Sequence, residues 1–376
     1  MPPAHIPSRK KEKGIAAAMY CICGVPDHAV NNPQESCRRT FGFDDAALPP
    51  FRRSPRRLCA GLWCVYALYM LLSVFFSLLC AVILSLFQIS ATHTPLSILL
   101  LSTLPAYFGA LPLCCLVLLH RFPAVRPPRQ TLVRFHALKW CVISVFLLET
   151  GARIGNSIEA LLRQILGMQL TNKAEQMLAD VPIRWIFLCT VVLAPLTEEL
   201  LFRKLLLDRL YFMNGAVAVF ASGFSFGLIH GNFSQFFYAF FLGCLLAVLY
   251  RRTGRLSYCV GLHAFVNCIG AFIPLLLRSM IQEPARSLLA GNAPLKSFHL
   301  LTSWQRFFVL LQVLFSGLQW IGIAAGLVFC MIALVRKRNR LLHSFSITDA
   351  GILFGNIGFI LFAFLCAASF AFSFLS

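Results

Sequence analysis

The sequence predicts an all-α fold, a polytopic transmembrane helical bundle with eight or nine spans. The chain of 376 residues is 59% hydrophobic and only 12% charged, whereas soluble chains are about half apolar and about a quarter charged. Its apolar runs reach the length of about 20 residues that a helix needs to cross a bilayer. Its basic residues gather in short clusters between these runs, as they do in membrane proteins that follow the positive-inside rule.

The elements are expected in a simple order. Residues 1–57 form a polar, mostly irregular head, and residues 58–376 form the transmembrane helical domain. The count of spans depends on whether 181–212 is one long helix or a span followed by an interfacial turn. An amphipathic segment opens 155–180 and is expected to lie on the outer interface. The predicted spans cover residues 58–89, 97–119, 138–154, 181–200, 215–230, 235–250, 256–278, 304–335 and 350–375.

The charge pattern predicts a multi-pass protein of the cell membrane with a cytoplasmic N-terminus. Segments 90–96 and 231–234 contain no Lys or Arg, and segments 155–180 and 279–303 mix charges of both signs. The basic segments alternate with these four along the chain. The net charge of +19 is not gathered on one continuous face, so no nucleic-acid partner is expected. Anionic lipid headgroups are the expected partners of the basic loops. The basic segments are the head, 120–139, 203–209, 251–255 and 336–340.

Most of the 15 cysteines lie inside the apolar runs, where cysteine behaves as a small hydrophobic residue. No disulfide framework is therefore predicted. Cys21, Cys23 and Cys37 lie in the polar head near His28, but their spacing does not match a four-ligand zinc pattern. The head also lacks the apolar core of a cleavable signal peptide.

Ionisable side chains inside the predicted spans are few, and such groups point to function by default. Glu149 and Arg153 are four residues apart, which favours an ion pair within one helix. Glu199 and Arg203 have the same spacing. Glu198 has no such partner and points about 100° away from Glu199. Glu198 must therefore find a partner on another span, and a buried carboxylate of this kind can act as a general base.

Two further spans carry histidines. His230 follows Phe226 by four residues, and His263 precedes Asn267 by four, so each pair shares one helix face. His263 and Asn267 suit either a pair of donors for a developing oxyanion or a metal ligand with its orienting neighbour. Each residue alone is more often a polar contact between helices, but three spans that carry such residues within about 70 positions favour a common site. Counting from the predicted loops places His230 nearer the outer side than Glu198 and His263.

These segments resemble the CPBP family of intramembrane proteases, which includes the CAAX prenyl endopeptidases and bacterial Abi-type proteins. The family pattern is E-E-x-x-x-R, then F-x-x-x-H, then H-x-x-x-N or H-x-x-x-D. The resemblance covers about residues 180–270, which would be the protease core. The residues that match the pattern are Glu198, Glu199, Arg203, Phe226, His230, His263 and Asn267.

The resemblance implies roles for these residues. Glu198 would be the base that activates water, and His230 would share that water. His263 and Asn267 would stabilise the tetrahedral intermediate. The residues with supporting roles would be Glu199, Arg203 and Phe226.

The resemblance leaves two interpretations of metal use. Many family members are named metalloproteases, and Glu198, His230 and His263 would be the zinc ligands in that case. The sequence lacks the H-E-x-x-H motif of the zincins. We prefer a glutamate mechanism that requires no cofactor.

Three functions compete at this stage. The first is an intramembrane endopeptidase of bacterial type that cleaves a peptide or a membrane-associated protein substrate. The second is a non-proteolytic role in bacteriocin self-immunity or as a membrane scaffold that binds a partner. The third is a transporter, which is disfavoured because the polar residues lie in three neighbouring spans rather than in matched halves. Loss of activity in Glu198→Gln at normal abundance would favour the protease.

Overall fold

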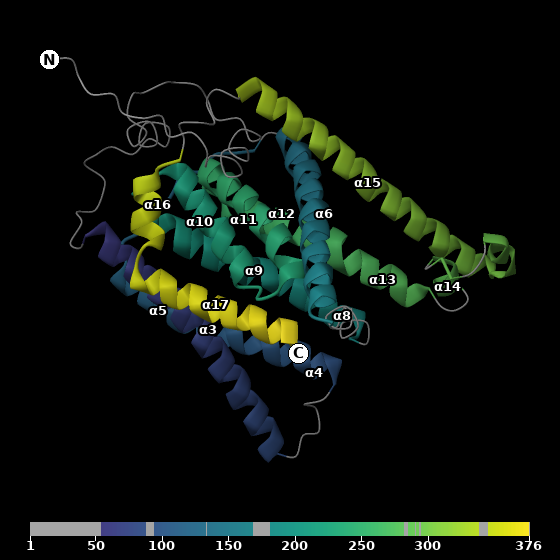
Figure 1. Cartoon of the computed structure of the whole chain (residues 1–376), viewed down its shortest axis with the longest axis horizontal. Helices are drawn as coiled ribbons and strands as arrows, with labels where there is room; N and C mark the ends of the chain where they lie inside the picture. The colour runs from purple at the N-terminus through teal and green to yellow at the C-terminus, as the bar shows by residue number, and fades with distance from the viewer. Residues whose placement is uncertain are drawn as a thin grey trace.

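A computed structural model describes residues 54–87, 94–132, 134–167, 181–281, 285–289, 291–292, 295–337 and 345–375. The regular elements within these residues are all helices (Figure 1), which confirms the predicted all-α fold. Seven helical stretches in these segments are long and apolar enough to cross a membrane. The protein is therefore a multi-pass membrane protein. The polar head with Cys21, Cys23, Cys37 and His28 lies outside the described residues.

The first helices pair with the last. Helix α3 (Pro55–Leu86) packs along α4 (Pro95–Pro105) and along the π-helical stretch η3 (Ala106–Ala110), which continues into α5 (Leu111–Arg121). The predicted last span is two helices, α16 (Ile347–Phe354) and α17 (Ile357–Leu375), because Asn356 caps a new helix after Gly355. Helix α17 packs on α3, although about 300 residues separate them in the sequence.

The centre of the bundle is α6 (Arg134–Ile165), α10 (Gly215–Leu228), α11 (Phe233–Thr253) and α12 (Leu256–Asn267). Helix α11 packs against α10 on one side and α6 on the other, and α15 (Ser303–Lys337) crosses the far side of α6 (Figure 1). The amphipathic segment that opens 155–180 continues α6 without a break to Ile165, and its place on the outer interface stays a prediction. The predicted ion pair is confirmed, with Arg153 Nη2 and Glu149 Oε2 at 3.6 Å.

Two further long segments contain π-helical turns, besides the one with η3. Residues 183–209 run as one helical segment through α8 (Ile183–Ile186), η4 (Phe187–Leu193), α9 (Ala194–Glu199), η5 (Leu200–Leu206) and η6 (Leu207–Arg209). The alternative of one long helix is therefore the one observed. Residues 256–280 likewise pass from α12 through η7 (Cys268–Phe272) into α13 (Ile273–Met280). The short elements α14 (Ala285–Leu289) and η8 (Leu295–Leu300) lead on to α15.

Several basic segments meet at one end of the bundle. The Val125 amide donates to the Asp208 carbonyl at 2.7 Å, and the Gln130 amide donates to the Thr253 carbonyl at 2.8 Å. Gly254 ends α11 with a φ of 58°, and a Cβ there would lie 2.5 Å from the Pro127 carbonyl oxygen. The loop after α5 is therefore tied to the ends of η6 and α11. The positive-inside pattern predicts that these basic segments share one side of the membrane, and in the structure they lie at one end of the bundle.

Candidate active site

The helix that carries the two adjacent glutamates changes its winding on both sides of them. Helix α9 is six residues long and lies between the π-helical stretches η4 and η5. Pro195 lies near the start of α9 and cannot donate a backbone hydrogen bond. Wider turns of this kind are frequent at functional sites, because an extra residue re-aims the side chains that follow. Here they set the directions of Glu198 and Glu199.

Glu199 points into the bundle and is fully buried. Its Oε2 lies 2.8 Å from Arg203 Nε, and the side chains of both residues are 0% exposed. Arg203 Nη2 also donates to Glu199 Oε1 at 3.2 Å, and Nη1 donates to the Ser222 hydroxyl of α10 at 3.0 Å. The guanidinium lies over the Phe226 ring at 5.1 Å. The expected pairing of Glu199 with Arg203 is thus confirmed, and it neutralises a charge that would be costly to leave alone.

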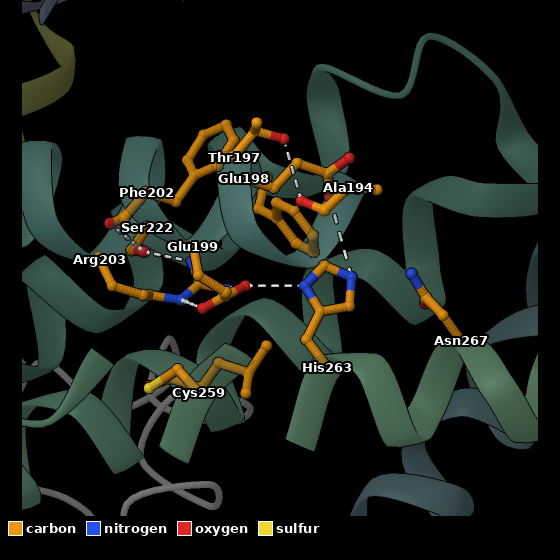
Figure 2. A network of polar contacts seen from close by, with 12 residues as sticks. Ala194, Thr197, Glu198, Glu199, Phe202, Arg203, Ser222, Cys259, His263 and Asn267 are labelled. Atoms are coloured by element: carbon orange, nitrogen blue, oxygen red, sulfur yellow. Dashed lines mark hydrogen bonds and ion pairs between the residues drawn. The ribbon is translucent and has the colours of Figure 1, made fainter. Parts of the chain in front are cut away.

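His263 links the two glutamates. Its Nδ1 lies 2.9 Å from Glu199 Oε1, and its Nε2 lies 3.8 Å from Glu198 Oε2 (Figure 2). A carboxylate can only accept, so Nδ1 carries the proton and donates to Glu199. That bond fixes the imidazole ring with Nε2 directed at Glu198.

Glu198 lies on the more open side of the same helix. Its side chain is 21% exposed. Its Oε1 accepts a hydrogen bond from the Tyr107 hydroxyl of η3 at 3.3 Å. Glu198 therefore finds partners on other spans, as the sequence required, and these partners are Tyr107 and His263. One oxygen of the carboxylate is held by a phenol and the other faces an imidazole.

His230 follows the end of α10 and lies beside Phe226. Its Nδ1 is 2.7 Å from the Phe226 carbonyl oxygen, so Nδ1 donates and Nε2 is left as the acceptor nitrogen. The Phe226 ring lies 5.0 Å from the His230 ring and 5.6 Å from the His263 ring, measured between centroids. The two imidazoles therefore flank one phenylalanine, and His230 is not remote from His263 in depth.

Asn267 lies one turn after His263 on α12 (Figure 2). Its Nδ2 donates to the Thr190 carbonyl of η4 at 2.8 Å. The amide thereby joins α12 to the segment that carries the glutamates. Nδ2 has a second N–H, so this contact leaves one donor of the amide for another acceptor.

Three contributors to this arrangement were not identified from the sequence. Tyr107 lies far upstream in an apolar run. Ser222 and Thr190 are of residue types that are common in membrane helices, so neither stands out in the sequence. No spacing rule marks these residues, because each meets its partner across helices rather than along one. The only available signal for Tyr107 was a tyrosine two residues after a proline inside a span.

The described residues contain no group of three or more His, Cys, Asp or Glu side chains placed to hold a metal ion. Glu198 and His263 lie together, and His263 uses Nδ1 on Glu199 rather than on a ligand. The predicted zinc set of Glu198, His230 and His263 is therefore not assembled in this arrangement. The structure instead offers a carboxylate, two imidazoles and a carboxamide, which can move protons and donate hydrogen bonds without a metal.

Two comparisons with known proteins point to membrane peptidases. Residues 180–269 match the family model described as "Type II CAAX prenyl endopeptidase Rce1-like". A protein of Bacillus subtilis (strain 168) named "Putative membrane peptidase YdiL" is 24% identical over 156 residues, which are 41% of this chain and 60% of that protein. This chain thus spans about 60% of that relative's length. No solved structure matches the chain. All seven residues of the family pattern lie within the matched segment, and Tyr107 lies outside it.

Proposed function

We propose that this protein, whose residues 180–269 form a domain of the CPBP, Rce1-like family of intramembrane proteases, is an endopeptidase. It hydrolyses a peptide bond of a membrane-associated protein or of a peptide. The observation that carries the proposal is the placement of Glu198 Oε2 3.8 Å from His263 Nε2. A partly exposed carboxylate there faces an imidazole that a buried ion pair holds in place.

Glu198 is the general base of the proposed reaction. Two polar atoms 3.8 Å apart can both bind one water that lies beside the line between them. Glu198 Oε2 takes a proton from this water as its oxygen adds to the carbonyl carbon of the substrate. The same proton then passes to the amide nitrogen as the C–N bond breaks, which leaves a carboxylic acid and an amine. Base and acid are thus one group, and the charges balance.

The other residues of the pattern act on the water and the oxyanion. His230 has a free Nε2 and is proposed to share the attacking water. The second N–H of Asn267 and His263 Nε2 are proposed to donate to the oxyanion, which requires His263 to be protonated on both nitrogens. Glu199, Arg203 and Phe226 hold these groups in position.

No cofactor is required in this proposal. Zinc bound by Glu198, His230 and His263 is the alternative, and a chelator separates the two interpretations. If zinc were essential, activity would disappear in chelator and return on addition of Zn²⁺. We expect activity to persist through the chelator treatment.

Location and partners follow from the basic end of the bundle. We propose that the loop after α5 and the ends of η6 and α11 face the cytoplasm, with the N-terminus on the same side. The basic side chains there would contact anionic lipid headgroups, which attract Lys and Arg near the surface. Substrate then reaches Glu198 below that surface, in the cell membrane.

The test is cleavage of fluorogenic peptides by the purified protein in detergent or lipid. We expect turnover by the wild type and none by Glu198→Gln, which keeps the size of the side chain but cannot take up a proton. Glu149→Gln is the matched control, because it makes the same change at a carboxylate of α6 that pairs with Arg153. Equal activity of wild type and Glu198→Gln would refute the mechanism. A wild type that cleaves no peptide would favour the self-immunity or scaffold role.

A further inference from the structure

Tyr107 belongs to a part of the chain that the family pattern does not include. It lies in the π-helical stretch η3, two residues after Pro105. Across η3, the Gly109 backbone lies against α3, and a Cβ on Gly109 would be 2.9 Å from the Phe76 ring. This close packing sets the position of η3 beside the helix that carries the glutamates. The half-buried Tyr107 side chain extends from η3 to Glu198.

The hydrogen bond from Tyr107 gives the two oxygens of the Glu198 carboxylate different partners. Tyr107 donates its hydroxyl proton to Glu198 Oε1 at 3.3 Å, while Oε2 faces His263 at 3.8 Å. Rotation of the carboxylate would exchange the two oxygens, and the phenol opposes that rotation. Oε2 is therefore the oxygen that stays directed at the imidazole.

We propose that Tyr107 is a positioning residue for hydrolysis, which anchors Glu198 Oε1 so that Oε2 is the proton acceptor. This inference rests on the proposed function of Glu198 as the base. A hydrogen bond to a charged group is among the stronger ones in proteins.

Other tyrosines show that the hydroxyl contact, not aromatic bulk, distinguishes Tyr107. Tyr69 and Tyr238 also lie near enough to Glu198 to interact electrostatically with its carboxylate. Within the described residues, Tyr107 is the tyrosine whose hydroxyl is hydrogen-bonded to the Glu198 carboxylate. Tyr69→Phe is thus a matched control for Tyr107→Phe, because both changes remove one hydroxyl close to the same carboxylate.

The first measurement is steady-state cleavage of one peptide by the full chain. We expect kcat of Tyr107→Phe to fall about tenfold with KM within about twofold of wild type, as for loss of a hydrogen bond to a charged group. Tyr69→Phe is expected to keep kcat within about twofold. Equal kcat in the two variants, whether unchanged or lowered, would overturn the assignment, because the hydroxyl of Tyr107 would then have no special role.

The second measurement detects the contact without activity. The infrared difference spectrum of wild type minus Glu198→Gln isolates the carboxylate band of Glu198. We expect this band to shift in the Tyr107→Phe background and to stay unchanged in the Tyr69→Phe background. An unshifted band with a cleaving wild type overturns the Tyr107 inference alone. A wild type that cleaves nothing overturns the proposed function and the role of Tyr107 with it, even where the band shifts.

Discussion

Replacement of Arg203 by methionine should destabilise the bundle more than the same replacement at Arg153. Both arginines pair with a glutamate four residues earlier on a helix. The Arg203 and Glu199 side chains are both 0% exposed, whereas Arg153 is 52% exposed and its partner 17%. The two variants therefore make the same chemical change at the same spacing, and only the burial of the pair differs.

The expected loss of stability is larger at Arg203 than at Arg153. Removal of one partner of a buried pair costs about 3–5 kcal/mol, because the other charge remains buried and uncompensated. His263 donates to Glu199 and offsets part of this, so we expect Arg203→Met to fall near 3 kcal/mol, at the lower end of that range. The exposed pair contributes about 0–1 kcal/mol. Arg153 also lies over the Trp320 ring at 4.2 Å, which adds on the order of 0.5–1 kcal/mol.

Thermal unfolding in detergent can be followed with a thiol-reactive dye. Cys59, Cys114, Cys244 and Cys259 are buried and react only when the bundle opens. At about 2 °C per kcal/mol, Arg203→Met should lower the midpoint by about 6 °C and Arg153→Met by about 4 °C at most. Glu199→Gln added to Arg203→Met should recover part of the loss. A loss from Arg203→Met no larger than that from Arg153→Met would refute the reasoning.

Two further predictions concern close approaches between helices. Gly223→Ala should lower the free energy of unfolding by about 1–3 kcal/mol through overpacking, because the new Cβ would lie 2.3 Å from Cys244 Sγ of α11. Gly261→Ala is the control, because nothing lies within 4 Å of its Cβ. It should not lower the unfolding midpoint in the same dye assay. Gly326→Ala should weaken the packing of α15 on α6, because its Cβ would lie 2.1 Å from the Phe146 Cβ of α6. The rate of proteolytic cleavage of the chain between α6 and α15 should therefore rise. Gly317→Ala on the same helix has open space and should leave the cleavage rate unchanged; equal rates for the two would contradict the contact.

The fold class was predictable because membrane helices follow composition. The apolar runs gave the positions of the long helices to within a few residues, for example Phe233–Thr253 against the expected 235–250. The internal irregularities were not predictable in the same way. The π-helical stretches depend on how each helix packs on its neighbours, and sequence periodicity assumes a constant 3.6 residues per turn. The continuation of α6 past residue 154 was missed because its polar residues were assigned to an interface.

The candidate site was predictable where partners lie on one helix. The spacing of Glu199 and Arg203 predicts their contact directly, because four residues make about one turn of a helix. Contacts between helices are different, because nothing local in the sequence records which face meets which. Hence His263 was identified as a site residue, but its bond to Glu199 rather than to a ligand was not. Tyr107 was missed for the same reason.

The adjacent glutamates are expected to perform different tasks, because a helix separates neighbouring side chains by about 100°. Glu199 points inward, where a guanidinium neutralises it, and it can only hold His263 in place. Glu198 points to the more open side, where its side chain is 21% exposed and its Oε2 faces His263. His263 contacts both glutamates. The buried ion pair of Glu199 with Arg203 therefore holds His263 in place beside Glu198, the carboxylate proposed as the base. An exchange of roles is therefore not expected: an active Glu198→Gln variant that relied on Glu199 would require the ion pair with Arg203 to break first.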